Sequence, residues 1–143
     1  FFAILTSHPQ IRFAVAIVDA DVIDRINILQ ATHCAMIEAL AQLQPQPEHV
    51  LVDGKPVKSM KLPQTAIVKG DTLSYSIAAA SVLAKVTRDR VMLEFDEEFP
   101  GYGFADHKGY GTPKHLAAIA EHGPCAIHRR SFAPFKSAQV ELL

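Results

Sequence analysis

The sequence lacks several features that would place the protein in a particular class. No apolar run approaches the ~20 residues that a membrane-spanning helix requires. Residues 1–5 are apolar, but they are few and have no basic leader, so they do not form a secretory signal. There is no internal repeat, no glycine-rich nucleotide loop and no nucleophilic-serine elbow. These absences argue against membrane, secreted and repeat proteins and against two common enzyme classes.

Cysteine is scarce as well. Cys34 and Cys125 are the only two cysteines in the 143 residues, and their spacing fits neither a disulfide framework nor a zinc site. We expect Cys34 to lie in a helix and Cys125 in a loop. A reduced, cytoplasmic protein with no membrane partner follows as the expectation.

A strong charge of one sign is also missing, because the formal net charge is only −1. All lysines and arginines except Arg12 and Arg25 nevertheless follow residue 54, which slightly favours a polyanionic partner. The part of the chain after residue 54 also contains an acidic cluster, which we expect on a solvated helix face and which consists of Glu94, Asp96, Glu97 and Glu98. With 49% hydrophobic and 20% charged residues, the chain has the composition of one globular domain with a real core.

The pattern of apolar residues predicts an α/β fold. Short apolar runs at residues 13–18, 49–52 and 65–68 predict strands. Helical spacing predicts helices from residue 22 to about 43, from 72 through about 95, and at 114–121. In the last of these, Thr112 is a suitable N-cap, Pro113 suits the first position and Gly123 a stop.

Two of the predicted strands end at an aspartate beside a glycine, Asp53 before Gly54 and Asp71 after Gly70. If the strands lie side by side, both carboxylates emerge at one edge of the sheet, where α/β proteins place their sites. Carboxylate oxygens suit Mg²⁺ or Mn²⁺. Spacing alone favours two ordinary turn aspartates, and the simplest interpretation of Asp71 by itself is the N-cap of the following helix.

Residues 104–115 form a predicted loop that is rich in glycine and cations. Lys108 and main-chain N–H groups there could hold phosphates, and Tyr110 could stack on a sugar or base, although an ordinary loop has the same composition. Arg129 and Arg130 stand beside a serine and a phenylalanine further on. The simplest interpretation of residues 88–90 (Arg-Asp-Arg) is a surface charge cluster.

Several blocks, in this order, resemble bacterial ribonuclease HII. They are Arg-Ile-Asn-Ile-Leu-Gln-Ala-Thr at residues 25–32, Leu-Val-Asp-Gly at 51–54, Lys-Gly-Asp at 69–71 with the small-residue helix at 76–89, His-Lys-Gly-Tyr-Gly-Thr at 107–112, and His-Arg-Arg-Ser-Phe at 128–132. The resemblance covers about residues 24–136, which is most of the chain.

This resemblance implies a ribonuclease H-like α/β fold with C-terminal helices. It implies endonucleolytic cleavage of RNA in RNA/DNA hybrids, and at ribonucleotides embedded in duplex DNA, leaving 5′-phosphates. The family's site is a cluster of four carboxylates that binds Mn²⁺ or Mg²⁺, and by motif Asp53 and Asp71 match two of them. Tyr110 matches the tyrosine that packs on the sugar at the ribonucleotide–DNA junction. Lys108, Arg129 and Arg130 are then candidates for contacts to backbone phosphates.

The sequence departs from the family pattern in one respect. The family opens with a strand that ends in an Asp-Glu pair, followed by a Gly-Arg-Gly turn, and these 143 residues contain no such motif. We therefore expect residues 1–143 to be a single partial domain, incomplete at its N-terminus, monomeric, and inactive alone. The alternatives are a non-catalytic module that binds hybrid duplexes, a remnant, or an unrelated α/β module that binds a metal or phosphate through its two aspartates.

Overall fold

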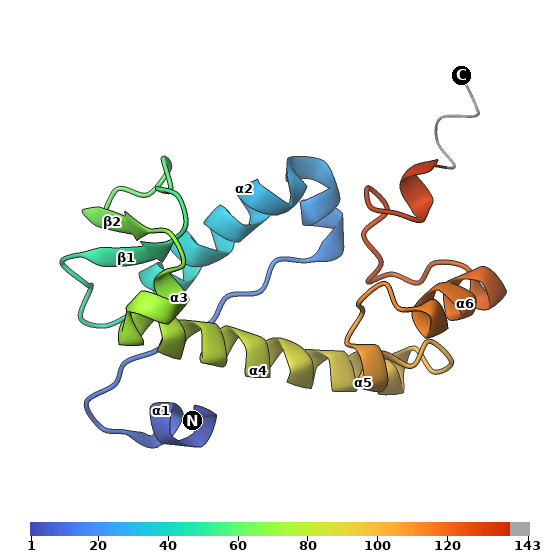
Figure 1. Ribbon diagram of the computed structural model, residues 1–143, viewed down its shortest axis with the longest axis horizontal. Coiled ribbons are helices and arrows are strands. Elements are labelled where there is room, and N and C mark those ends of the chain that lie inside the picture. The colour runs from blue at the N-terminus through green and yellow to red at the C-terminus, as the bar shows by residue number, and fades with distance from the viewer. Residues whose placement is uncertain (138–143) are drawn as a thin grey trace. The chain divides into compact units, whose positions relative to one another are not determined.

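The computed structural model describes residues 1–137, and their contacts divide the chain into two compact units. Unit 1 comprises Phe1–Ile17 and Thr32–Thr87, and unit 2 comprises Val18–Ala31 and the chain from Arg88 onward. The elements, shown in Figure 1, are α1 (Phe2–Ser7), α2 (Ala20–Ala41), β1 (Val50–Asp53), β2 (Gln64–Ile67), α3 (Gly70–Leu73), α4 (Tyr75–Glu98), α5 (Phe104–His107), α6 (Pro113–His122) and the 3₁₀ helix η1 (Phe135–Ser137).

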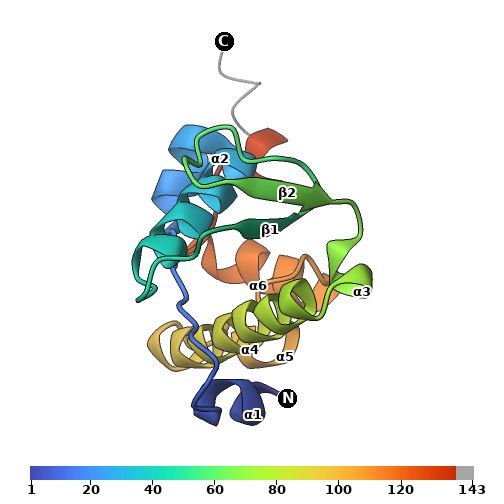
Figure 2. The same cartoon turned by 90° about the vertical axis from the view of Figure 1, so that its left-hand side faces the viewer.

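The sheet of unit 1 consists of β1 and β2, which run parallel and side by side (Figure 2). Val50 pairs with Gln64, and Asp53 pairs with Ile67. The ladder continues past the strand ends, where the Gly54 N–H donates to the Ile67 carbonyl at 2.9 Å. Both strands were predicted from sequence, each displaced by one residue, and both are confirmed. Asp53 is therefore the last residue of its strand, as expected.

The segment between β1 and β2 is held in place by the Gln64 side chain. Its amide oxygen accepts from the Val57 N–H at 2.8 Å, and its amide nitrogen donates to the Val57 carbonyl at 2.9 Å. This pair of bonds satisfies both main-chain groups of Val57, whose side chain is fully buried. The connection is thus an anchored loop that returns the chain to the start of β2.

The helix predicted from residue 72 is interrupted near its start. The chain leaves β2 through the four-residue α3 and then adopts an extended conformation at Ser74 (φ −129°, ψ 122°) before α4 begins. The Ser74 hydroxyl accepts from the Ile77 N–H at 3.4 Å, in the manner of an N-cap. Leu73 is 72% exposed, whereas Ile77, four residues later, is buried. The interruption at Ser74 accounts for this difference, since it separates Leu73 from the helical register of α4.

No strand forms at residues 13–18, where the sequence predicted one. A strand exists only when its main-chain groups pair with a neighbour. The two strands within the described residues pair with each other, and neither pairs with this segment. Phe13 and Ile17, two apolar residues of the run, remain 43% and 60% exposed.

The predicted helix after residue 20 is present as α2, but it contains a break. Asn27 has φ 68° and ψ 163°, which no helical residue adopts. Its side-chain oxygen accepts from the Gln30 N–H at 3.1 Å, so Asn27 caps the second part of α2. Leu29, two residues after the break, is 58% exposed.

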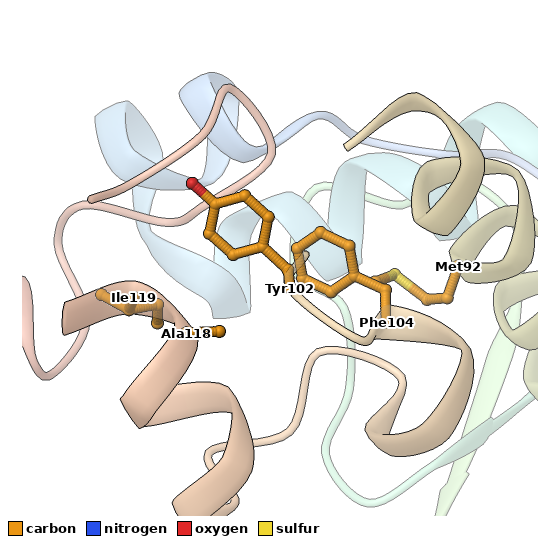
Figure 3. Close-up of a cluster of buried hydrophobic side chains, with 5 residues drawn as sticks. All are labelled: Met92, Tyr102, Phe104, Ala118 and Ile119. Atoms are coloured by element: carbon orange, nitrogen blue, oxygen red, sulfur yellow. The ribbon is translucent and has the colours of Figure 1, made fainter. Parts of the chain in front are cut away.

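The core of unit 2 forms around two stacked aromatic rings (Figure 3). Tyr102 and Phe104 have centroids 5.3 Å apart and planes only 7° from parallel, and Met92, Ala118 and Ile119 complete the buried cluster. Phe104 opens α5, a short helix within the segment predicted as a loop. It forms because Phe104 is drawn into the core, at 1% exposure, while the Asp96 carboxylate accepts from the Ala105 N–H at 3.1 Å.

The final predicted helix is confirmed as α6. The Thr112 hydroxyl accepts from the His115 N–H at 3.3 Å, Pro113 is the first helical residue, and Gly123 follows the last with φ 74°. Cys34 lies in α2 and Cys125 outside any helix or strand, as predicted. Throughout residues 1–137, none of the helices has the length and apolarity needed to cross a membrane.

Phe104→Ala should lower the free energy of unfolding by about 3–5 kcal/mol, because it removes a fully buried ring and leaves a cavity beneath Tyr102. Phe1→Ala is the matched control, since Phe1 is 91% exposed, and its effect should stay within about 0.5 kcal/mol. Urea denaturation followed by circular dichroism measures both. Equal effects of the two substitutions would contradict this description of the core.

Candidate functional site

Asp53 and Asp71 lie at the ends of neighbouring elements of unit 1. Asp53 closes β1, and one of its carboxylate oxygens accepts from the Gly70 N–H at 2.8 Å. Gly70 immediately precedes Asp71, and it begins α3 after β2. Both aspartate side chains belong to exposed residues. The hydrogen bond from Gly70 to Asp53 thus joins the two chain segments that carry the predicted metal ligands.

The approach of these segments requires a glycine at position 70. A Cβ atom there would lie 2.5 Å from Cδ1 of Ile77 and 3.4 Å from the accepting oxygen of Asp53. The first distance is shorter than real Cβ contacts allow, so the end of the Ile77 side chain would have to move, and the second is at the edge of ordinary contact. Ile77 is itself buried, so it has little room to shift. Glycine at this position therefore lets the turn after β2 reach the Asp53 carboxylate.

Asp71 is not the N-cap of a helix, contrary to the simplest interpretation of the sequence. The N-cap of α3 is Lys69, which has a left-handed conformation (φ 56°, ψ 41°), and Asp71 lies inside the first turn. The Lys69 carbonyl accepts from both the Thr72 N–H at 3.1 Å and the Thr72 hydroxyl at 2.8 Å. This position leaves the Asp71 carboxylate exposed rather than bound to the helix start.

The donor set formed by the two aspartates suits a hard divalent cation. Mg²⁺ is commonly held by one or two carboxylates and completes its shell with waters and substrate phosphates, and both aspartates here are exposed. No group of three or more histidine, cysteine, aspartate or glutamate side chains within the described residues is arranged to hold a metal ion. The residues present therefore fit a partial, open carboxylate site rather than a closed structural one.

Tyr110 is held by Arg88 in unit 2. The Arg88 guanidinium lies 4.9 Å from the centroid of the Tyr110 ring and donates to the Lys108 carbonyl at 2.7 Å. Tyr110 remains 57% exposed, so its ring is accessible while its position is constrained. Interpreting residues 88–90 as a surface charge cluster missed this role of Arg88. Its partners lie 20 residues and more along the chain, and no local signal points to them.

The turn before Tyr110 contains two consecutive residues with positive φ. Lys108 and Gly109 both have positive φ, 51° and 78°, and a Cβ at Gly109 would lie 3.3 Å from Cε of Met92. The Lys108 ammonium donates to the Ala105 carbonyl near the end of α5. Lys108 thus stabilises α5, and its predicted contact with a phosphate would require that bond to be exchanged.

Arg129 and Arg130 lie in a segment that is anchored by Asp24. The Asp24 carboxylate accepts from the Arg130 N–H at 2.7 Å and from the Ser131 N–H and hydroxyl at 2.9 and 2.5 Å. The Arg129 guanidinium lies 4.1 Å above the Phe132 ring. Asp24 was not predicted as a site residue, and its partners, more than 100 residues away, leave no trace in the local sequence.

Several groups act on the pKa of Asp24. Partial burial alone would raise this pKa, but the hydrogen bonds from Ser131 and Arg130, together with the charge of Arg129, outweigh burial and hold the pKa below its ordinary value. The carboxylate is therefore stabilised in its charged form. Its contribution is complete above the ordinary pKa of about 3.9 and is lost as pH falls through the lower pKa of the folded state.

Comparison with known proteins agrees with these observations. The model of the ribonuclease HII family matches residues 5–135. The chain belongs to the ribonuclease HII family. It is 56% identical over 132 residues to ribonuclease HII from Geobacter metallireducens, covering 92% of this chain and 62% of that protein. It is 52% identical over 130 residues to ribonuclease HII from Listeria monocytogenes serotype 4b. That match covers 91% of this chain and 49% of the Listeria protein.

A solved structure shows the fold. Ribonuclease H2 from Pyrococcus horikoshii OT3 matches with a TM-score of 0.67 at 22% identity, covering 87% of this chain and 66% of that chain. The predicted ribonuclease H-like α/β fold is confirmed. The chain spans about half to three-fifths of the length of its curated ribonuclease HII relatives. The predictions of a single domain, a monomer and a cytoplasmic location stay predictions.

Asp24→Asn should loosen the segment that carries Arg129 and Arg130. The neutral amide is a poorer acceptor, so hydrogen-exchange protection of the Arg130 and Ser131 amides should fall about tenfold at pH 7. In the unsubstituted chain the same protection should persist to pH 4 and decline below it. Asp106→Asn is the control, because Asp106 pairs with Lys114 instead. Unchanged protection in Asp24→Asn would contradict the anchoring role.

Proposed function

We propose that the chain supplies part of a ribonuclease HII-type endonuclease, with Asp53 and Asp71 as two of its metal ligands. The observation that carries this proposal is the 2.8 Å hydrogen bond from Gly70 to Asp53, which joins the strand end bearing one aspartate to the turn bearing the other. Family membership supports the same assignment, because both aspartates lie within the matched residues 5–135. The substrates are RNA/DNA hybrids and duplex DNA that contains a ribonucleotide.

The two aspartates would hold Mg²⁺ or Mn²⁺ with oxygen donors. A bound ion of this kind would supply activation of a water and stabilisation of the leaving 3′-oxygen, for an in-line displacement that leaves a 5′-phosphate. The contribution of the chain is orientation: the Gly70 N–H donates to one oxygen of Asp53 and so restrains the position of the carboxylate. Asp71, exposed on the first turn of α3, supplies the second carboxylate.

Residues of unit 2 would contact the duplex. The exposed ring of Tyr110, held from one side by Arg88, offers a surface on which a ribose can pack, and contacts to the 2′-hydroxyl distinguish RNA from DNA. Arg129 and Arg130, on the segment anchored by Asp24, are candidates for phosphate contacts, and Lys108 is a further one. Contacts of this kind make duplex affinity decrease as salt increases.

Two carboxylates are fewer than the four that the resemblance implies. We propose that the 143-residue chain binds the duplex but does not incise it at the rate of the complete enzyme. A segment that carries the family's Asp-Glu pair and Gly-Arg-Gly turn would restore incision. A module that only binds hybrid duplexes is the second candidate, favoured by the exposed Tyr110 ring.

A labelled duplex with a single ribonucleotide tests this proposal. The chain alone should bind it in a salt-dependent manner without incision. Fusion to the family's N-terminal segment should give Mn²⁺- or Mg²⁺-dependent incision with 5′-phosphate ends, which Asp53→Asn or Asp71→Asn abolishes. Tyr110→Ala should cost about 1–3 kcal/mol of binding, whereas Tyr110→Phe, which keeps the ring, should cost much less.

Two results would contradict the proposal. Incision by the 143-residue chain at the rate of the fused protein would show that the missing motif is dispensable. Absence of incision in the fused protein, with binding retained, would favour the module that only binds duplexes.

A further inference from the structure

Three histidines are buried together in unit 2, and the proposed chemistry uses none of them. His107, His115 and His128 are 7%, 5% and 8% exposed. The rings of His107 and His115 stack with centroids 4.3 Å apart, and His115 and His128 have centroids 5.2 Å apart. Buried polar side chains need hydrogen-bond partners, so the partners of these rings reveal what the cluster holds.

The hydrogen bonds of His115 and His128 define their tautomers. Nδ1 of His115 lies 2.9 Å from the Tyr110 carbonyl, which can only accept, so Nδ1 carries the proton. Neutral His115 then accepts at Nε2, which lies 3.0 Å from Nε2 of His128. His128 must therefore carry its proton on Nε2, and its Nδ1 accepts from the Cys125 N–H at 3.0 Å. The hydrogen bond to Tyr110 therefore determines the tautomer of His115, and the tautomer of His115 determines that of His128.

His107 obeys the same logic. Its Nε2 donates to the Tyr102 carbonyl at 2.8 Å, and its Nδ1 accepts from the Gly109 N–H at 3.1 Å. All three rings thus use both nitrogens with one proton each. An additional proton on Nε2 of His115 would oppose the Nε2–H of His128 across their 3.0 Å contact. An additional proton on Nδ1 of His128 would oppose the Cys125 N–H across theirs, so the network is complete only when the rings are neutral.

The main-chain groups held by the cluster surround the exposed tyrosine. His107 accepts from Gly109, His115 donates to the carbonyl of Tyr110, and the Tyr110 N–H donates to the His107 carbonyl at 2.9 Å. These bonds fix the backbone on both sides of the Tyr110 side chain. Arg88 acts on the ring itself, and the histidines act on the chain that bears it.

We propose that His115, kept in one neutral tautomer by His128, is a positioning residue for Tyr110. A proton added at Nε2 of His115 sets this nitrogen against the Nε2–H of His128, drives the two rings apart, and so loosens the backbone at Tyr110 and weakens duplex binding. The effect on binding rests on the proposed function, whereas the effect on the Tyr110 backbone does not. His115 acts through Tyr110 and touches no substrate.

The surroundings of the rings favour the neutral forms. Burial lowers the pKa of His115, with a smaller contribution from His107, while the bond to Tyr110 opposes the shift. Burial also lowers the pKa of His128, and His115 and Arg130 add to this effect. The stacked ring from α5 and the arginine are thus both unfavourable neighbours for an additional charge.

Other titratable groups around the cluster are Tyr102, Cys125 and Glu98. Burial raises the pKa of both Tyr102 and Cys125, and the charge of Glu98 on α4 also raises that of Cys125, so the phenol and thiol stay neutral near pH 7. The Asp106–Lys114 pair lies between α5 and α6, where its charges offset each other. None of these groups reverses the preference for neutral imidazoles.

The sign of the pH dependence follows. The unfolded chain takes up protons near the ordinary histidine pKa of about 6.5, before His115 and His128 do in the folded chain. The stability that the neutral cluster contributes is therefore complete above about pH 6.5. It decreases as pH falls from that value toward the lower pKa values of the folded state.

Nitrogen-15 NMR of the histidines in the 143-residue chain tests the tautomers without any substitution. At pH 7.5, His115 should be protonated on Nδ1, and His107 and His128 on Nε2. On acidification, protection of the Gly109 and Tyr110 amides should be lost together with this pattern. Protonation of His115 on Nε2, or charged imidazoles in the folded chain at pH 7.5, would overturn the proposal.

Substitutions test the positioning role. In His115→Asn the amide N–H takes the place of Nδ1–H and can still reach the Tyr110 carbonyl, whereas His115→Leu has no donor. We expect His115→Leu to weaken binding of the single-ribonucleotide duplex about five- to tenfold, the loss of one hydrogen bond, and to flatten its pH dependence. His115→Asn should restore most of the affinity. The control is His8→Leu, an exposed histidine of unit 1, which should have no effect.

The readouts separate the two proposals. If the unsubstituted chain does not bind the duplex but shows the expected tautomers, and His115→Leu exposes the Tyr110 amide, the proposed function fails and the positioning role stands. If duplex binding is normal and His115→Leu changes neither affinity nor amide protection, the positioning role is wrong.

Discussion

The hydrogen bond from the Gly70 N–H to the Asp53 carboxylate, 2.8 Å long, is the contact on which the candidate site depends. It ties the end of β1 to the turn after β2, and it exists because residue 70 has no side chain that would collide with Ile77. The same turn, in which Lys69 has a left-handed backbone conformation, also determines the position of Asp71. Strand pairing, turn geometry and the position of both carboxylates are therefore parts of one local arrangement.

In unit 2 the exposed ring of Tyr110 lies on a backbone that several neighbouring residues hold in place. Arg88 lies against the Tyr110 ring, His115 binds its carbonyl, and His107 binds the neighbouring Gly109. Asp24 does the same for the segment with Arg129 and Arg130. Tyr110 and Arg130 are exposed and Arg129 is partly exposed, while Arg88 and Asp24, which are distant in sequence, help determine where these residues lie.

Local signals predicted much of the fold. The strands ending near Asp53 and before Gly70, and α6 with its Thr112 cap, depend on residues a few positions apart, which sequence patterns capture. The prediction of a strand at residues 13–18 was wrong because a strand forms only when its main-chain groups pair with a neighbouring strand. Asp71 was wrongly considered an N-cap because α3 begins at Gly70, with Lys69 as its N-cap, so Asp71 lies inside the first turn. Arg88 and Asp24 were missed since their partners lie 20 and more than 100 residues away.

The central claim is that Asp53 and Asp71 bind one divalent ion together. Titration of the ¹⁵N-labelled 143-residue chain with Mn²⁺ tests this claim directly, because the paramagnetic ion broadens amide signals near it. We expect the Asp53, Gly70 and Asp71 signals to broaden at the same Mn²⁺ concentration, and either Asp53→Asn or Asp71→Asn to weaken the broadening at all three. Broadening that persists in the double substitution, or that spares these three amides, would contradict the claim.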